Sequence, residues 1–106
     1  RVLFAQLDRG RLRSEHWLET LLSLDVEGRI AQLLLDALSL FGEPHPQGTL
    51  ITAPLTHADL AGLIGSTRET VTLTLGKMKR TGVIDFYKRR VVVRDHNALK
   101  QCLKPA

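Results

Sequence analysis

The stretch GSTRETVTLTL, residues 65–75, combines the signals that end one helix with those that begin another. Gly65 suits the left-handed conformation in which many helices end. Ser66 and Glu69 have the S-x-x-E spacing of a helix start, although Thr67 could be the capping residue instead. Two short helices joined by a tight turn that contains glycine form a helix-turn-helix, so residues 65–75 predict the centre of such a motif.

The residues before this stretch predict the first helix of the motif. Thr56 and Asp59 form a variant capping box in which Asp replaces Glu or Gln. Leu60, Leu63 and Ile64 follow with the spacing of a helix that buries one side. Many helical hairpins share this pattern, so taken alone it is moderately specific.

The second helix, predicted over residues 67–81, exposes a definite set of side chains when its residues are placed at about 100° intervals. Val71, Leu75 and Met78 fall together and are expected to face the core. The start of the helix is then exposed, and it carries the side chains predicted to contact bases: Arg68, Glu69, Thr72 and Leu73.

The chemistry of these side chains suits the DNA major groove, into which the first turn of a recognition helix points. Arg68 can donate two hydrogen bonds to guanine, and Glu69 can accept one from cytosine N4. The alternative for this pair is an exposed ion pair plus a capping carboxylate. Leu73 could contact a thymine methyl group, or it could be an exposed leucine that the fold tolerates.

Residues 83–87 and 91–93 predict two strands joined through Lys88, Arg89 and Arg90, hence a β-hairpin with a basic tip. A helix-turn-helix followed by a hairpin is the winged-helix arrangement, in which the wing, here residues 87–91, lies along phosphates. Helix starts also offer free N–H groups to phosphate. Besides the three wing residues, the expected phosphate contacts include Ser66, Thr67, Thr70, Lys77 and Arg80.

Charge and composition favour a nucleic-acid partner for a single small domain. The chain has 106 residues and a net charge of +4, but residues 68–94 hold eight basic and two acidic side chains, a local charge of +6. Such clustering is typical of a surface that binds a polyanion, and a solvated basic surface is the alternative. The single Cys102 excludes an internal disulfide and favours a cytoplasmic protein. No apolar run is long enough to span a membrane.

The remaining segments predict a helical domain with an N-terminal appendage. Residues 1–23 are expected to be the C-terminal part of a dimerisation or linker helix, and residues 24–106 the winged helix-turn-helix domain. Asp25 should cap a helix over residues 26–41; residues 42–48 should form a loop, 49–53 a short strand, and 97–103 a last helix capped by Asp95. The appendage carries a coiled-coil-like seam formed by Leu3, Leu7, Gly10, Ser14, Trp17, Leu21 and Leu24. Because the chain opens on Arg1, we expect a fragment of a longer protein.

Catalytic signatures are absent from the sequence. The four histidines, at positions 16, 45, 57 and 96, have neither the H-x-x-x-H nor the HExxH spacing, and no P-loop, GxSxG or GxGxxG motif occurs. We therefore expect a protein that is not an enzyme, with no metal site and no cofactor in this fragment.

The segment LTHADLAGLIGSTRETVTLTLGKMKRTGVI closely resembles the DNA-binding domain of the CRP/FNR superfamily of bacterial transcription regulators, and SLDVEGRIAQLLLDAL resembles the helix after the family's dimerisation helix. The resemblance runs from about residue 21 to about residue 95, and STRETV is its most specific part. Through GSTR-TVT and the loop that begins FG-P, the region is especially similar to the cyanobacterial global nitrogen regulator type.

The resemblance implies roles for particular residues. Arg68 and Glu69 match an arginine and a glutamate that read bases in many members, and Thr56 and His57 match positions that commonly touch phosphate. Leu73 stands where members commonly have a second arginine, so the half-site of the relatives should not be assumed here. Members carry an N-terminal effector domain, bind palindromic sites as homodimers and contact RNA polymerase.

Together these observations predict a mainly α fold with a small β-hairpin, a winged helix-turn-helix preceded by the end of a dimerisation helix. The expected function is sequence-specific binding of double-stranded DNA by the output domain of a dimeric transcription regulator, in the cytoplasm and associated with the nucleoid. The alternative is a winged-helix module for protein–protein interaction.

Overall fold

The first helix of the structure, α3 (Val26–Phe41), begins where it does because Asp25 caps it: Asp25 Oδ1 accepts a hydrogen bond from the backbone N–H of Gly28 at 2.7 Å. The computed structural model describes residues 23–103. The predicted seam of residues 1–23 therefore lies outside the described residues, apart from its last positions. Within residues 23–103, no helix has both the length and the apolar character needed to cross a membrane.

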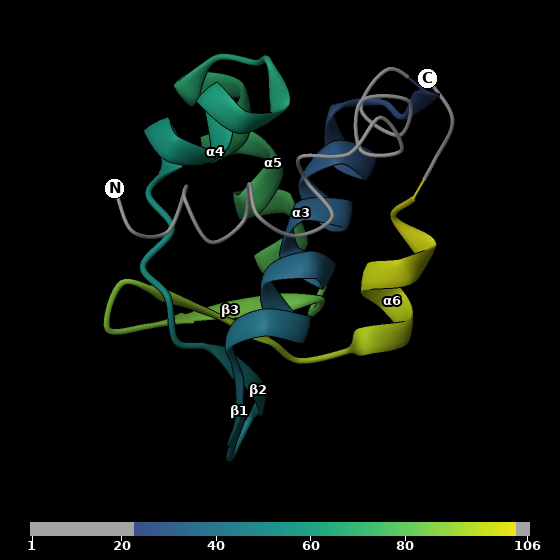
Figure 1. Cartoon of the computed structure of the whole chain (residues 1–106). Helices are drawn as coiled ribbons and strands as arrows, with labels where there is room; N and C mark the ends of the chain where they lie inside the picture. Colours follow the sequence, from purple (N-terminus) through teal and green to yellow (C-terminus); the bar gives the residue numbers. More distant parts are fainter. Residues whose placement is uncertain (1–22, 104–106) are drawn as a thin grey trace.

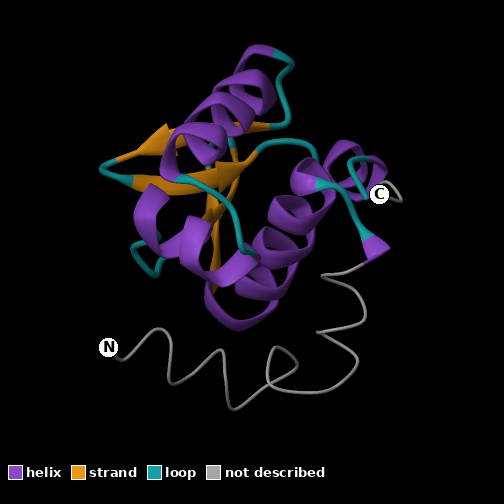
Figure 2. Cartoon of the chain, turned by 90° about the horizontal axis from the view of Figure 1, so that it is seen from above, coloured by secondary structure: helices purple, strands orange, loops and turns teal. Residues whose placement is uncertain are grey.

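Helix α3 runs through the middle of the domain (Figure 1 and Figure 2). The side chains of Ile30, Leu33 and Leu34 are fully buried. Arg29 ties the start of this helix to its surroundings, because Nε donates to the carbonyl of Leu24 at 3.0 Å and Nη1 donates to the carbonyl of Ile64 at 3.3 Å. The point where the chain enters the domain is thereby joined to the end of the next helix.

Four antiparallel strands form one sheet in the order β1-β2-β4-β3. Strands β1 (Gly42–His45) and β2 (Gly48–Ile51) pair with each other, and β3 (Ile84–Tyr87) pairs with β4 (Arg90–Val93). The link between the two hairpins is the pairing of β2 with β4 at Thr49 with Val93 and at Leu50 with Val92. In Figure 1 the β1–β2 hairpin projects below the helices and the β3–β4 hairpin extends to the left.

The prediction of a loop over residues 42–48 was wrong, since this segment supplies β1 and the turn into β2. Pro44 is compatible with a strand here because β1 lies at the edge of the sheet. Proline has no N–H group to donate, and an edge strand can leave that side of its backbone unpaired. Gly48 packs so closely on the backbone of Val93 that any Cβ would collide with its carbonyl oxygen. The two glycines and prolines in this segment thus permit a hairpin rather than exclude one.

Helices α4 (His57–Ile64) and α5 (Arg68–Arg80) form the predicted helical hairpin. The Thr56 hydroxyl caps α4 by accepting from the N–H of Asp59 at 3.0 Å, and Gly65 ends α4 with the left-handed φ of 70°. Of the two candidate caps for α5, Thr67 is the one observed. Ser66 is still part of the preceding turn, since its N–H donates to the carbonyl of Ala61.

The last helix, α6 (His96–Gln101), is one residue earlier at its start and two shorter at its end than predicted, with Asp95 as its cap. Leu99 buries this helix against α3, and Cys102 is buried beside it, with its thiol donating to the carbonyl of Ala98. The domain core is therefore enclosed by α3, α4, α5, α6 and one face of the sheet. This core holds the helical hairpin and the wing in place.

Candidate nucleic-acid interface

Helix α5 has the rotation that its periodicity predicts. Val71 is fully buried, and Leu75 and Met78 are each 1% exposed. On the other side Leu73 is 74% exposed, the highest value among the exposed large hydrophobic side chains of the described residues. The four side chains predicted to contact bases are all exposed and line one shallow surface pocket: Arg68, Glu69, Thr72 and Leu73.

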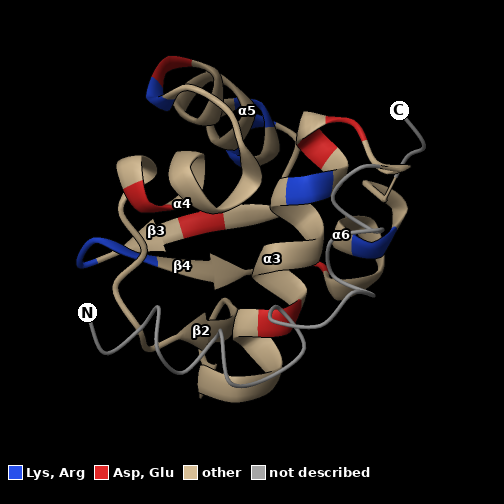
Figure 3. Cartoon of the chain, turned by 45° about the horizontal axis from the view of Figure 1, so that its top comes forward, with Lys and Arg blue, Asp and Glu red and all other residues tan. Residues whose placement is uncertain are grey.

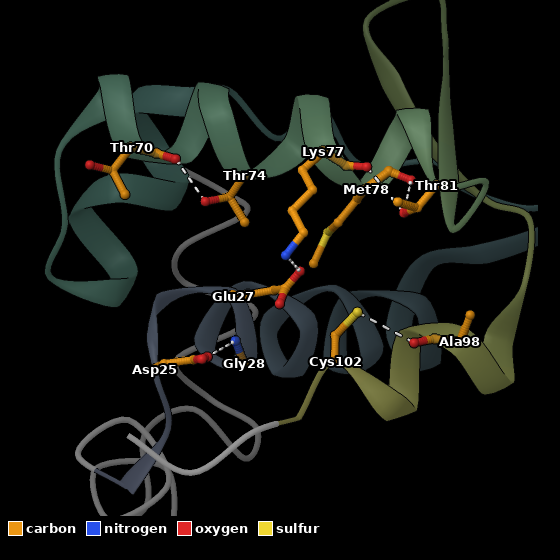
Figure 4. A network of polar contacts seen from close by, with 10 residues as sticks. All are labelled: Asp25, Glu27, Gly28, Thr70, Thr74, Lys77, Met78, Thr81, Ala98 and Cys102. Atoms are coloured by element: carbon orange, nitrogen blue, oxygen red, sulfur yellow. Dashed lines mark hydrogen bonds and ion pairs between the residues drawn. The ribbon is translucent and has the colours of Figure 1, made fainter.

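The first turn of α5 is fixed by a small network of threonines. The Thr67 hydroxyl accepts from the N–H of Thr70 at 3.2 Å and donates to the Thr70 hydroxyl at 2.9 Å. One turn later, Thr74 Oγ1 donates to the carbonyl of Thr70 at 2.8 Å (Figure 4). Because these groups hold each other, the exposed Arg68 and Glu69 project from a helix start whose backbone is well supported.

A contact between the two helices of the hairpin positions one member of the exposed face. His57 Nδ1, at the first residue of α4, lies 2.7 Å from Thr72 Oγ1 on α5, a hydrogen bond whose direction depends on the imidazole tautomer. His57 is half-buried, and this contact joins the start of α4 to the exposed face of α5. No pattern in the sequence indicates this pairing.

The wing ends in a two-residue turn formed by Lys88 and Arg89. Both residues have positive φ values, 48° and 65°. A two-residue turn with positive φ at both positions favours Asn-Gly or similar pairs, and for other side chains this conformation carries a conformational cost. Both side chains are exposed, and Lys88 Nζ lies 5.3 Å from the centre of the Tyr87 ring. The chain thus presents two cations at a tip whose backbone conformation favours Asn or Gly.

Arg90 differs from its two neighbours, although all three were predicted to contact phosphate. It belongs to β4 and is half-buried. Its Nε donates to the carbonyl of Thr52 at 2.6 Å, and its Nη1 donates to the carbonyl of Lys88 at 3.4 Å. Arg90 therefore anchors the base of the wing tip to the segment after β2.

Two other basic residues of α5 are engaged by acidic partners. Lys77 Nζ lies 3.3 Å from Glu27 Oε1 of α3, an ion pair that Figure 4 shows between the two helices. Lys79 Nζ lies 3.9 Å from Asp85 Oδ1 and 5.8 Å from the centre of the Phe86 ring. The local charge of +6 is thus partly compensated inside the domain. Within residues 68–94, five exposed basic side chains have no acidic partner in the described part of the chain: Arg68, Arg80, Lys88, Arg89 and Arg94.

The wing and the helical hairpin lie next to each other on the surface. A cavity of about 590 Å³ is lined by the segment before α4, the start of α4, Leu75 of α5 and the wing, and both His57 and Arg89 are among its lining residues. His57 in turn contacts Thr72, so the surface continues from the wing to the exposed start of α5. Figure 3 shows the basic wing tip and the Arg–Glu pair at the start of α5. We call this continuous surface, made by the start of α4, the exposed face of α5 and the wing tip, the reading face.

The described part of the chain contains no group of three or more His, Cys, Asp or Glu side chains that could hold a metal ion.

Thr56 is exposed at the start of α4, and Ser66 is half-buried in the turn. The predicted contacts thus fall into two groups. Arg90 and Lys77 are held by other parts of the domain, and the remainder lie on or beside the helical hairpin and wing.

A helical hairpin with an exposed second helix, followed by a two-stranded wing, defines a winged helix-turn-helix protein. Residues 28–102 match the family model described as the Crp-like helix-turn-helix domain, and the chain belongs to this family. The family and the fold predicted from the sequence are therefore confirmed, with the second hairpin as an addition to the expected sheet.

Comparison with known proteins identifies relatives of the same kind. The chain is 37% identical over 100 residues to the global nitrogen regulator of Synechococcus elongatus, covering 94% of this chain and 45% of the relative. It is 32% identical over 97 residues to the CRP-like cAMP-activated global transcriptional regulator of Mycobacterium tuberculosis, covering 92% of this chain and 43% of that protein. The chain thus spans less than half the length of these curated relatives.

Solved structures give the same result. A CRP/FNR-family transcriptional regulator from Thermus thermophilus superposes with a TM-score of 0.73 at 28% identity, covering 93% of this chain and 51% of the other. The CO-dependent transcription factor CooA from Carboxydothermus hydrogenoformans superposes with a TM-score of 0.70 at 28% identity, and the match covers 76% of this chain and 37% of CooA. Homologues of this chain are therefore transcription regulators that carry a Crp-like domain.

Proposed function

We propose that this domain binds double-stranded DNA in a sequence-specific manner, with α5 in the major groove and the wing on the phosphate backbone. One observation carries the proposal. Helix α5 buries Val71, Leu75 and Met78 while it exposes at its start an arginine, a glutamate, a threonine and a leucine. These side chains can donate to, accept from and make apolar contact with base edges.

Arg68 and Glu69 are proposed to read bases directly. An exposed arginine in the first turn can donate two parallel hydrogen bonds to guanine O6 and N7, and a neighbouring glutamate can accept from cytosine N4. Neither side chain is held by another group of the described domain through an ion pair. Thr72, whose hydroxyl is held by His57, is proposed as the third base-contacting residue.

Phosphate contacts are proposed mainly for the wing tip and the two helix starts. Lys88 and Arg89 are exposed cations held in a costly backbone conformation, which suits a binding role better than a structural one. Thr56, His57, Ser66, Thr67 and Thr70 lie around the starts of α4 and α5, where N–H groups favour an anion. Arg80 adds an exposed charge, whereas Lys77 and Arg90 would first have to leave their partners Glu27 and Thr52.

The wider role proposed for the chain is that of the output domain of a dimeric transcription regulator in the bacterial cytoplasm, associated with the nucleoid. The support is that its relatives are named as transcription regulators and are about twice as long as this chain. A homodimer related by two-fold symmetry would read a palindromic site. Contact with RNA polymerase is proposed on the same family grounds.

Selection of preferred duplexes from a random pool by the 106-residue chain tests the proposal. We expect one enriched half-site and binding that weakens steeply as salt is raised. Arg68→Ala should cost about 1–3 kcal/mol and relax the preference at one base position, whereas Lys88→Ala should weaken all sequences about equally. Lys100→Ala, which removes an exposed charge from α6, is the matched control and should change neither.

The absence of any enriched sequence would count against DNA recognition and would favour the alternative, in which the winged helix binds another protein. An Arg68→Ala variant with its sequence preference intact would count against the assignment of Arg68 as a base-contacting residue.

A further inference from the structure

Leu73 stands out on the reading face because it is a large apolar side chain that the described domain, residues 23–103, leaves exposed. It is 74% exposed, although leucine gains about 1.5–3 kcal/mol when it is fully buried. It lies between the polar Thr72 and Thr74 and one turn after Glu69, so its surroundings on α5 are hydrophilic. A single exposed leucine can be incidental, and a second observation at the same place argues against this.

The second observation is Gly76, one turn after Leu73 on the same side of α5. Glycine inside a helix is less favourable than alanine by about 0.5–1 kcal/mol. Among the residues that the structure describes, none requires glycine at this position, since a Cβ would meet only the guanidinium end of Arg80, at 3.4 Å. Leu73 and Gly76 together therefore form an apolar, low surface patch on a helix that is otherwise polar outside.

We propose that Leu73 reads the 5-methyl group of a pyrimidine in the major groove, and that Gly76 lets the DNA approach closely enough for this contact. This inference rests on the proposed DNA binding and specifies what one residue of that surface recognises. The C5-methyl of thymine is the apolar group that base pairs present in the major groove, and apolar side chains contact it. The positive charges of Arg68 and Arg80 near the patch and of Lys88 and Arg89 on the wing select DNA, rather than an apolar protein surface, as the occupant.

The same chemistry has two sources in DNA, thymine and 5-methylcytosine. Both place a methyl group at C5, in the same position of the groove, and differ in their hydrogen-bonding groups. Leucine has no donor or acceptor with which to distinguish them. Leu73 is therefore expected to respond to the methyl group of either base, while Arg68 and Glu69 recognise hydrogen-bonding groups.

The test uses the 106-residue chain and the duplex that it selects. Each thymine is replaced in turn by deoxyuridine, which removes only the methyl group and keeps the base pair. Removal of the methyl group that Leu73 touches should weaken binding roughly three- to fivefold at one position in each half-site, the equivalent of about one buried methylene. At that position, 5-methylcytosine should bind more tightly than cytosine by a similar factor.

Variants of Leu73 assign the effect to this side chain. Leu73→Ala should bind thymine and uracil duplexes equally well, and Leu73→Met, which keeps an apolar side chain of similar volume, should retain the discrimination. Leu40→Ala, at a 53% exposed leucine of α3, is the matched control and should discriminate as the wild type does. Because Leu73 is exposed, its variants are expected to fold.

The outcomes separate this inference from the proposed function. A wild-type chain that selects a sequence but is indifferent to every uracil substitution, or a Leu73→Ala variant with undiminished discrimination, overturns the role of Leu73 and leaves DNA binding intact. A chain that selects no sequence overturns both. Discrimination at thymine without a gain at 5-methylcytosine supports the contact and assigns it to thymine.

Discussion

His57 Nδ1 and Thr72 Oγ1 lie 2.7 Å apart, although one residue begins α4 and the other lies in the second turn of α5. The first helix of the motif thereby holds a side chain of the surface proposed to read bases. An orientation that is set before DNA arrives lowers the entropy lost on binding.

The contribution of this hydrogen bond to stability can be measured with a double-mutant cycle. Thr72→Val removes the hydroxyl and keeps the shape, and His57→Ala removes its partner. In a double-mutant cycle the two changes should show a coupling energy of about 0.5–1.5 kcal/mol in urea unfolding, since a typical intramolecular hydrogen bond contributes that much. Additive effects would show that the hydrogen bond makes no contribution to stability.

Leu73 and Leu75 are predicted to respond very differently to truncation, although they are two residues apart on one helix. Leu75→Ala should destabilise the domain by about 2–5 kcal/mol because it leaves a cavity in the core. Leu73→Ala should change stability by less than about 0.5 kcal/mol. Urea unfolding of both variants measures the difference. Equal losses would contradict the observed rotation of α5.

Gly76→Ala is predicted to stabilise the domain by about 0.5–1 kcal/mol, because alanine favours the helix and the guanidinium of Arg80 can move aside. The same change should weaken DNA binding, since the added methyl group occupies space that the DNA would approach. Gly62→Ala in α4 is the matched control, because a Cβ there meets nothing within 4 Å. It should stabilise to a similar degree and leave binding unchanged. Stronger DNA binding by Gly76→Ala would argue against close approach at this position.

A single variant of the wing tip is predicted to stabilise the domain and to weaken DNA binding. Replacing Lys88 by Asn and Arg89 by Gly supplies the residues that a turn with two positive φ values favours, so the hairpin should gain about 1 kcal/mol or more in stability. DNA binding should weaken, and the slope of log affinity against log salt should fall by about one for each phosphate that the variant no longer neutralises. Thermal unfolding and titrations at several salt concentrations measure both effects. An unchanged salt slope would remove the wing tip from the interface.

Local signals explain what could be predicted from the sequence. The rotation of α5, the caps Thr56 and Asp25 and the left-handed Gly65 all depend on residues within one or two turns of each other. Such short-range patterns can be recognised without knowledge of the tertiary structure. The winged-helix fold and the exposure of the four side chains on α5 followed from them, and family membership followed from the resemblance of the segment around STRETV.

Features that depend on distant segments could not be predicted in the same way. The pairing of His57 with Thr72, of Lys77 with Glu27 and of Arg90 with the Thr52 carbonyl joins residues from 15 to 50 positions apart. Each needs the packing of two elements to be known first. The β1–β2 hairpin was missed for a related reason. Its glycines and prolines resemble a loop until the edge position of β1 in the sheet is known.

Arg29 links two distant parts of the domain. Its guanidinium joins the carbonyl of Leu24, where the chain enters α3, to the carbonyl of Ile64, at the turn between α4 and α5. A tilt imposed on α3 from its N-terminal end would therefore carry the turn and both helices with it. Through this one side chain, the segment that enters α3 is coupled mechanically to the helical hairpin.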